Sequence, residues 1–241
     1  MEPSQHELLI RVLSTGTIRV VGQFMWGSNY TFLSEVKSEN HTLSAVYKPS
    51  HGERPLWDFP HGTLATREVA AYVTSRALGW NMVPPTILRQ DGPAGAGSLQ
   101  LFVDVDPERY YFTFSDDEKQ CLRPVALLDL IINNADRKGG HIILAPNDHL
   151  WLIDHGLCFH KEYKLRTVVW DFINQPIPES LLDEVQTFRE LLETDVDLRA
   201  SYAELLSAPE IEALIQRTDK LLSEGIFPGP GPGRYQPWPL V

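Results

Sequence analysis

The sequence predicts an α+β fold of two lobes, and three observations lead to this prediction. The first hundred residues consist mainly of short runs rich in β-branched and alternating apolar residues, which favour strands. Beyond a short connector at residues 104–107, the apolar residues recur at helical spacing. The length of 241 residues, 43% of them hydrophobic, allows one large domain or two lobes that share a cleft. We therefore expect an antiparallel sheet with one helix, then a reduced helical lobe, with a ligand site between them.

The N-terminal lobe is predicted to span residues 1–104. A helix should start near Thr63, because the apolar positions that follow recur every four residues, and Gly79 provides its C-terminal stop. Turn chemistry at residues 27–29 joins the first two strands into a hairpin. The predicted strands are residues 16–24, 30–36, 42–48, 83–88 and 98–103.

The C-terminal lobe is predicted to span residues 105–226. Residues 118–133 form an expected helix that is apolar on most sides and therefore buried. Alternating Gly and Pro residues at 227–241 indicate a flexible or polyproline tail, with packing on the helical lobe or binding of a partner as the alternatives. The remaining expected elements are a hairpin of residues 141–145 and 150–154 and three amphipathic helices at 179–193, 197–206 and 208–222.

Composition excludes several classes of function. Acidic residues outnumber basic ones 32 to 21, which gives a net charge of −11 and argues against a nucleic-acid partner. The two cysteines, Cys121 and Cys158, form no CxxC pair and fit a reducing cytoplasm. The sequence lacks a run of 18 apolar residues and a secretory leader pattern. We expect a cytoplasmic protein without stable membrane insertion.

The densest polar cluster in an apolar setting is the segment 133–141, which follows a buried helix and precedes a buried strand. Asp154 lies eighteen residues after Asp136, at the end of the predicted hairpin, so these two carboxylates can converge with His141. Such a set can hold a divalent metal and phosphates while one aspartate accepts the proton of an attacking hydroxyl. The catalytic set includes Arg137, which neighbours Asp136.

Two charged residues in the N-terminal half complete this site in the prediction. Lys48 ends an apolar strand and can reach phosphate as a point charge if its neighbours face a cleft. Glu68 lies within the Ala/Val-rich helix, where it can pair with Lys48 and orient it. The turn of Gly27, Ser28 and Asn29 can present backbone N–H groups to phosphates.

The order of these features resembles the phosphatidylinositol 3-/4-kinase branch of the protein-kinase-like superfamily. The closest likeness is to type II phosphatidylinositol 4-kinases and to small kinase-like proteins found mainly in actinobacteria. The resemblance covers residues 16–160 in unbroken order. The matching stretches are Tyr47-Lys48-Pro49, Arg67-Glu68-Val69-Ala70-Ala71-Tyr72, Val83-Pro84-Pro85-Thr86, Gly97-Ser98-Leu99-Gln100-Leu101-Phe102-Val103, Leu128-Asp129 through Asp136-Arg137, and Ile153-Asp154-His155-Gly156-Leu157.

The resemblance implies ATP and Mg²⁺ as cofactors and assigns a role to each site residue. Lys48 would contact the nucleotide phosphates and Glu68 would steady it. Asp136 would be the catalytic aspartate and Asp154 would hold the magnesium. Ser28 and Asn29 would belong to the phosphate-binding loop, and the segment Gln100 to Val103, with Phe102 and Val103 at the connector, would give backbone hydrogen bonds to adenine.

One position departs from the family pattern in a way that bears on catalysis. The family places asparagine five residues after the catalytic aspartate as a second oxygen ligand for the metal, whereas this sequence has His141. Imidazole is a softer ligand than an amide oxygen, and magnesium prefers oxygen. His141 would therefore favour Mn²⁺, contact phosphate instead, or mark weakened catalysis.

The predicted function is an ATP-dependent phosphotransferase whose acceptor is a hydroxyl of a protein, lipid or small molecule. A cysteine-rich lipid-anchoring segment and a Lys/Arg cluster are both missing, so a protein or small-molecule acceptor is at least as well supported as a lipid. The alternatives are a nucleotide-binding pseudokinase that regulates a partner, and an enzyme that transfers AMP to protein. A metal hydrolase built from the histidines matches no helical ligand spacing.

Overall fold

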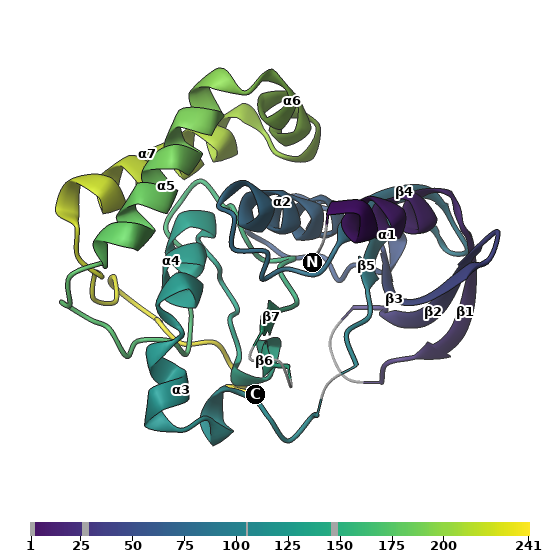
Figure 1. Ribbon diagram of the computed structural model, residues 1–241, viewed down its shortest axis with the longest axis horizontal. Helices are drawn as coiled ribbons and strands as arrows, with labels where there is room; N and C mark the ends of the chain where they lie inside the picture. The colour runs from purple at the N-terminus through teal and green to yellow at the C-terminus, as the bar shows by residue number, and fades with distance from the viewer. Residues whose placement is uncertain (1–2, 26–28, 105, 146–148) are drawn as a thin grey trace.

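The chain folds into a sheet-based N-terminal lobe and a helical C-terminal lobe (Figure 1), which confirms the predicted α+β class. The computed structural model describes residues 3–25, 29–104, 106–145 and 149–241. The N-terminal sheet is antiparallel, in the order β1-β2-β3-β5-β4. Its strands are β1 (Thr17–Gln23), β2 (Phe32–Ser38), β3 (His41–Pro49), β4 (Thr86–Gly92) and β5 (Gly95–Leu101).

Alternation along β3 determines which side chains reach the space between the lobes. Ala45 and Tyr47 are fully buried in an apolar cluster shared with α1 (Pro3–Thr15). Val46 and Lys48, one residue along in each case, line the interlobe cavity instead. The two-residue period of the strand therefore presents Lys48 to the cavity while its neighbours anchor the strand in the core.

Helix α1 corrects the prediction of a single helix in this lobe. Its residues Leu8, Val12 and Leu13 pack on the sheet, and the last two are almost fully buried. The apolar positions at i, i+4 and i+5 are the signal that identifies this helix. The signal is weak because only 13 residues form the helix and several of its apolar side chains stay partly exposed.

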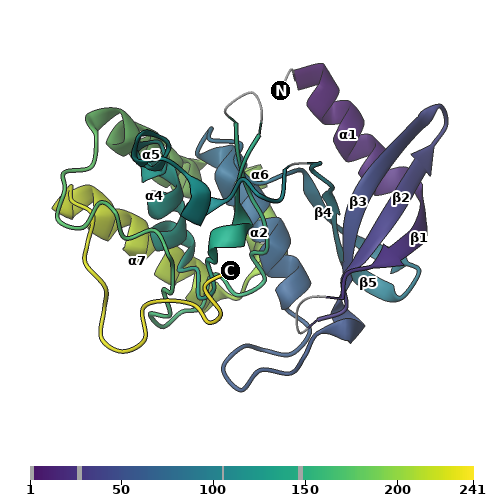
Figure 2. The same ribbon diagram turned by 90° about the horizontal axis from the view of Figure 1, so that it is seen from below.

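Helix α2 (Leu64–Ala77) lies between the sheet and the helical lobe (Figure 2) and begins one residue after Thr63. Most of its side chains are buried because it packs against elements of both lobes. The guanidinium of Arg67 donates to the carbonyl of Cys158 at 2.6 Å and forms an ion pair with Glu210. The helix that carries Glu68 is therefore fixed to the C-terminal lobe as well as to the sheet.

The helical lobe contains two helices where the sequence predicts one over residues 118–133. Pro124 lies in the first turn of the second helix, where its missing N–H costs nothing, and a proline ring does not fit inside a continuous helix. The hairpin and the three later helices agree with the prediction. The elements are α3 (Asp116–Gln120), α4 (Arg123–Ile132), β6 (Ile142–Leu144), β7 (Leu150–Leu152), α5 (Glu179–Thr194), α6 (Val196–Leu205) and α7 (Ala208–Glu224).

The C-terminal tail is packed, which corrects the expectation of a flexible terminus. Beyond α7 the chain runs without regular secondary structure across the helical lobe and ends beside β6 (yellow in Figure 1). Pro237 is buried, and the carbonyl of Leu240 accepts a hydrogen bond from the backbone of Gly139 at 2.8 Å. Repeated Gly and Pro prevent helix formation here but do not prevent docking.

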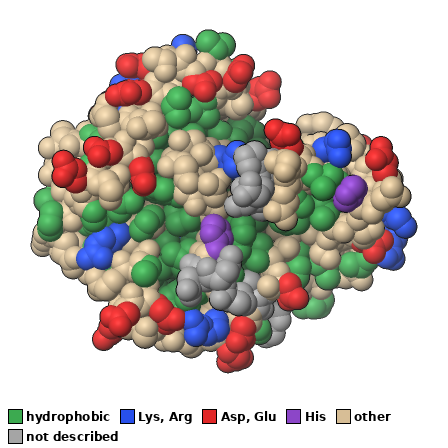
Figure 3. Space-filling model, in the orientation of Figure 1, with side chains coloured by type: hydrophobic (Ala, Val, Ile, Leu, Met, Phe, Trp, Pro, Cys, Tyr) green, Lys and Arg blue, Asp and Glu red, His purple; other side chains and the backbone are tan. Residues whose placement is uncertain are grey.

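Acidic side chains lie mainly at the margins of the face shown in Figure 3, and hydrophobic side chains surround the junction between the lobes. None of the helices in the described part of the chain combines the length and the apolar character needed to cross a bilayer.

The two cysteines should differ sharply in reactivity. Cys121 is exposed, whereas Cys158 is fully buried and burial raises the pKa of its thiol well above the usual value. Because the thiolate is the reactive form, we expect Ellman's reagent at pH 8 to modify one thiol in the folded protein and two in guanidinium chloride. Cys121→Ser should leave the folded protein without a fast-reacting thiol. Rapid reaction of that variant would contradict the prediction.

Candidate functional site

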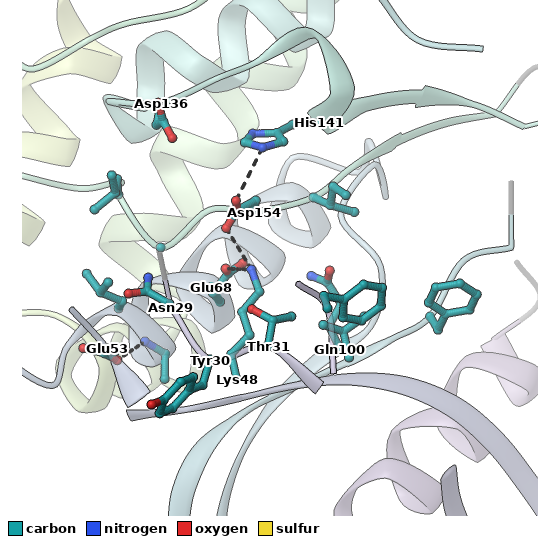
Figure 4. A pocket seen from close by; sticks show the side chains of 18 of the residues that line it. Asn29, Tyr30, Thr31, Lys48, Glu53, Glu68, Gln100, Asp136, His141 and Asp154 are labelled. Atoms are coloured by element: carbon teal, nitrogen blue, oxygen red, sulfur yellow. Dashed lines mark hydrogen bonds and ion pairs between the residues drawn. The ribbon is translucent and has the colours of Figure 1, made fainter. Parts of the chain in front are cut away.

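A cavity of about 340 Å³ opens between the lobes, and charged side chains from both lobes project into it (Figure 4). Gly27 and Ser28 lie outside the described residues. Asn29 lines the cavity, with its side-chain oxygen accepting the backbone N–H of Arg54 at 2.7 Å. The other sequence-predicted residues at the cavity are Lys48, Glu68, Gln100, Phe102, Val103, Asp136, His141 and Asp154.

The ammonium group of Lys48 joins the two lobes. It forms an ion pair with Glu68 from α2 and donates to Oδ1 of Asp154, which follows β7, at 2.9 Å. Burial alone would lower the pKa of Lys48, but the neighbouring carboxylates of Asp154 and Glu68 raise it above its ordinary value. Lys48 is therefore a fixed positive charge at the centre of the cavity.

Glu68 is held by a second contact from the C-terminal lobe. Its Oε2 accepts the backbone N–H of His155 at 2.9 Å, while its Oε1 faces Lys48. Only 4% of the Glu68 side chain is exposed, so these hydrogen bonds replace the water that the carboxylate loses on burial. Strand β3, helix α2 and the segment after β7 therefore have a common anchor.

Asp154 lies in the left-handed region of backbone conformation, with a φ of 62°, and half of its side chain is exposed to the cavity. The nearby Lys48 ammonium holds the pKa of Asp154 well below its usual range, so the group is a carboxylate. Its other oxygen is 3.4 Å from Nε2 of His141. The backbone N–H of Ile153 donates to the carbonyl of His141 at 3.1 Å, which extends the hairpin pairing and brings this pair together.

His141 is an uncharged imidazole in this setting. Burial lowers its pKa to about 4, although the carboxylate of Asp154 acts in the opposite direction. The lone pair of the neutral ring lies on Nδ1, which accepts the backbone N–H of Lys138 at 3.4 Å, so Nε2 carries the proton beside Asp154 and can bind a metal only after the proton moves to Nδ1.

Asp136 faces Asp154 across the cavity from the loop after α4 (Figure 4). That loop begins at Asn133, whose positive φ of 51° ends the helix, and the backbone N–H of Asp136 donates to the side chain of Asn134 at 3.0 Å. Burial raises the pKa of Asp136, against the effect of Lys138, whose ammonium is 3.2 Å away. A carboxylate with a raised pKa is a better proton acceptor.

Arg137 corrects the sequence prediction, which placed it in the catalytic set. Its side chain is fully buried, does not line the cavity and forms a salt bridge with buried Asp129 at 3.0 Å. It also donates to the carbonyl of Ile153 at 3.1 Å and contacts Nε2 of His155 at 2.8 Å. Arg137 therefore connects the Asp136 loop to the Asp154 segment.

The donor groups at the cavity suit a divalent metal that a second ligand helps to hold. Among the described residues, no three His, Cys, Asp or Glu side chains converge as a complete ligand set. Magnesium sites commonly use one or two carboxylates, with waters and nucleotide phosphates supplying the remaining oxygens. A half-exposed carboxylate at Asp154 beside the neutral imidazole of His141 fits a metal that a bound nucleotide helps to hold.

The opposite end of the cavity, where β5 leads into the connector, offers backbone groups and apolar walls. The side-chain amide of Gln100 donates to Thr86 at 2.8 Å, and the N–H of Phe102 donates to the carbonyl of Ser44 at 2.9 Å. The N–H of Val103 has no backbone partner within the described ranges. Val103, which lines the cavity, therefore has a backbone N–H that is available to a ligand.

Sequence reasoning missed several residues that line the cavity. Lys138 is the most informative, because its position two residues after Asp136 places an ammonium group beside that carboxylate. Glu53 accepts the backbone N–H of Ala65 at 3.1 Å and so satisfies a free donor at the start of α2. The cluster of charged residues around Asp136 is a sequence signal that could have identified Lys138. The loop that contains Glu53 has no motif that could have identified it. The missed apolar lining residues include Val46, Leu64, Ile143, Ile153 and Leu157.

The chain has sequence relatives and structural neighbours among known proteins. No established family profile matches the sequence. Protein Rv2133c of Mycobacterium tuberculosis is 41% identical over 95% of this chain and 94% of its own length. A phosphatidylinositol 4-kinase gamma 4 of Oryza sativa subsp. japonica is 35% identical over 45% of this chain, and one of Arabidopsis thaliana is 27% identical over 81%.

The chain belongs to the same family as protein Rv2133c of Mycobacterium tuberculosis, and it is similar in sequence to phosphatidylinositol 4-kinase gamma proteins. It spans 22% of the length of the Oryza relative and 39% of the Arabidopsis relative. The kinase-like fold and these relatives support a phosphotransferase.

The solved structures extend the likeness to the whole fold. The Golgi casein kinase with Mn/ADP bound superposes with a TM-score of 0.62 over 92% of this chain and 76% of that chain, at 17% identity. The Helicobacter pylori kinase CtkA superposes with a TM-score of 0.51 over 89% of this chain and 94% of that chain, at 12% identity. At these identities the likeness shows the protein-kinase-like fold.

Proposed function

We propose that the chain transfers the γ-phosphate of ATP to a hydroxyl group of a protein or small molecule. The observation that supports this most is the contact of Lys48 with both Glu68 and Asp154 in one interlobe cavity that Asp136 also lines. A cation between two lobes, with a carboxylate on either side of the expected phosphate position, suits positioning and charge neutralisation. Both effects govern phosphoryl transfer.

In this proposal the adenine lies against the segment of Phe102 and Val103, and the triphosphate extends toward Lys48. The apolar walls of the cavity remove water from the base, and the Val103 N–H supplies a directional donor. The phosphates displace the Asp154 oxygen that now occupies one donor of the Lys48 ammonium, while Glu68 keeps that ammonium in place.

The transfer itself needs a base and an in-line acceptor. The acceptor hydroxyl oxygen forms a bond to the γ-phosphorus, the bond from that phosphorus to the β–γ bridging oxygen breaks, and ADP leaves with those electrons. The hydroxyl proton passes to Asp136, whose burial-raised pKa suits this role. Lys138 beside Asp136 offers a second positive charge close to the transferred group.

Asp154 and His141 would hold a divalent metal in this proposal. Held by these two side chains, a divalent metal would supply positive charge that stabilises the negative charge of the phosphates. The Golgi casein kinase structure has manganese and ADP bound, and the imidazole of His141 would favour manganese over magnesium, which prefers oxygen ligands.

The test uses the purified chain with γ-labelled ATP, Mg²⁺ or Mn²⁺, and either a cell lysate or a lipid extract. We expect label on a protein or small-molecule acceptor with at least one metal, and loss of label with chelator. Mass spectrometry of the product distinguishes the addition of phosphate from the addition of AMP. Absence of nucleotide binding with both metals would overturn the proposal.

His141 supports a second candidate, a nucleotide-binding pseudokinase. Its neutral imidazole replaces the amide oxygen expected at this position, so binding could persist where transfer is slow. This candidate predicts ATP binding without transfer to any acceptor across both metals.

The variant His141→Asn separates the two candidates. If the chain is a kinase limited by its metal ligand, the amide oxygen should raise the Mg²⁺-dependent transfer rate relative to the Mn²⁺-dependent rate by about 10-fold or more, a difference of about 1.4 kcal/mol. Initial rates with each metal at saturating ATP provide the measurement. His51→Asn, at an exposed position in the 3₁₀ turn Ser50–Gly52 and outside the cavity lining, is the matched control and should leave the ratio unchanged. An unchanged ratio in His141→Asn would rule out a metal-selecting role for this residue.

A further inference from the structure

The C-terminal tail reaches the loop that carries Asp136. The backbone N–H of Gly139 donates to the carbonyl of Leu240 at 2.8 Å, only three residues beyond Asp136. A Cβ atom at Gly139 would approach the Phe112 ring to 2.6 Å. The loop is therefore enclosed between an aromatic ring and the end of the chain, and glycine leaves room for both.

A second anchor lies a few residues earlier in the tail. The carbonyl of Tyr235 accepts from the backbone N–H of Thr167 and from the indole N–H of Trp170, each at 3.2 Å. The Thr167 hydroxyl donates to Asp129 at 2.9 Å, and Asp129 forms a salt bridge with Arg137. The contacts of Tyr235 are thus continuous with the network that supports the Asp136 loop.

The same network extends to the opposite carboxylate of the cavity. Arg137 donates to the carbonyl of Ile153 and contacts His155, which are the neighbours of Asp154 on either side. The tail thus contacts the Asp136 loop directly and reaches the Asp154 segment through buried polar groups. Leu240 adds apolar packing against the large core cluster of the helical lobe.

We propose that residues 235–241 form a strap that positions the Asp136 loop for transfer. The inference rests on the proposed phosphotransferase function and adds a positioning element to it. The residues of the strap do not line the nucleotide cavity, so the strap acts on catalytic geometry and leaves nucleotide contacts intact.

Truncation after Pro237 tests the strap, because it removes the Leu240 carbonyl while keeping buried Pro237. We expect kcat to fall by about 10- to 100-fold, since a misplacement of about 1 Å at a catalytic group has that effect. The ATP dissociation constant should stay within about twofold, because the groups that hold the nucleotide are unchanged. Amide exchange at Gly139 should become faster by at least about tenfold as its acceptor is lost.

Point variants keep the strap proposal testable if the truncated chain does not fold. Leu240→Asp places a charge against the core and should reproduce the loss in kcat, whereas Leu240→Met should retain far more activity. Gln236→Ala is the matched control, because that side chain is exposed and forms no hydrogen bond among the described residues. Thermal unfolding of every variant confirms that the fold persists.

Each outcome has one meaning for the strap. A transfer-active full-length chain whose truncation leaves kcat and Gly139 exchange unchanged would overturn the strap alone. Equal losses of ATP affinity and of kcat would show a general structural defect and would also overturn it. A full-length chain that binds ATP but transfers nothing would overturn the proposed function and, with it, the positioning role.

Discussion

Asp136→Asn is expected to lower the rate of phosphoryl transfer by about 10³-fold, within the range of 10²–10⁴ that a positioned general base contributes. Asparagine has the same shape but cannot accept the hydroxyl proton. It also removes the negative charge that Lys138 balances at 3.2 Å. The measurement is kcat under saturating ATP and metal, with label in the product as the signal.

Nucleotide binding by the same variant should be nearly unchanged or slightly stronger, because a carboxylate that repels phosphate is lost. Calorimetric titration of ATP provides this control. Glu53→Gln is the matched comparison, because it neutralises another acidic side chain at the cavity while keeping an oxygen for the N–H of Ala65. A loss of transfer in Glu53→Gln as large as that in Asp136→Asn would contradict a special role for Asp136.

The site was predictable to the extent that its residues follow strongly patterned elements. Lys48 ends an alternating strand, Glu68 lies on an Ala/Val-rich helix, and Asp154 ends a short apolar hairpin. Each pattern sets the direction of one side chain, and the order of the patterns matches a family. Convergence of the three side chains required the tertiary fold, because they come from opposite lobes.

Arg137 shows where sequence reasoning ended. An arginine beside an aspartate in a polar loop gives the same sequence pattern whether its side chain contacts substrate or a buried carboxylate. Its partner Asp129 lies on the inner face of α4, where an acidic residue interrupts an apolar helix. A buried acid of this kind requires a buried cation, and that requirement was the available signal.

Helix α1 and the C-terminal tail were predicted wrongly from the sequence for the same physical reason. Helix α1 and the tail both owe their structure to surfaces formed by distant residues: α1 to the sheet, and the tail to the loop at Gly139. Local propensity is weak in both segments, since one is short and the other rich in Gly and Pro. Pro124, in contrast, is a local signal that was overlooked: a proline in the first turn of α4 marks the break within the single helix that the periodicity predicted.

The second large effect is expected for the buried ion pair of Arg137 and Asp129. Arg137→Met should lower the free energy of unfolding by about 3–5 kcal/mol, because it leaves the carboxylate of Asp129 buried without its counter-ion. Urea unfolding followed by circular dichroism gives the value. Arg199→Met is the matched control on the exposed side of α6 and should change stability by less than about 0.5 kcal/mol.

The destabilisation in Arg137→Met should depend on pH with a definite sign. Burial raises the pKa of Asp129, and Arg137 is the first of the groups that oppose this, so the variant raises that pKa further. A carboxyl group whose pKa is higher in the folded state favours folding while it is protonated. This contribution to stability is fully present below the unfolded pKa and is lost as the pH rises through the folded pKa. The loss of stability should therefore be smaller at pH 5 than at pH 8. A pH-independent loss would mean that Asp129 stays ionised through other contacts, such as the 2.9 Å hydrogen bond from Thr167.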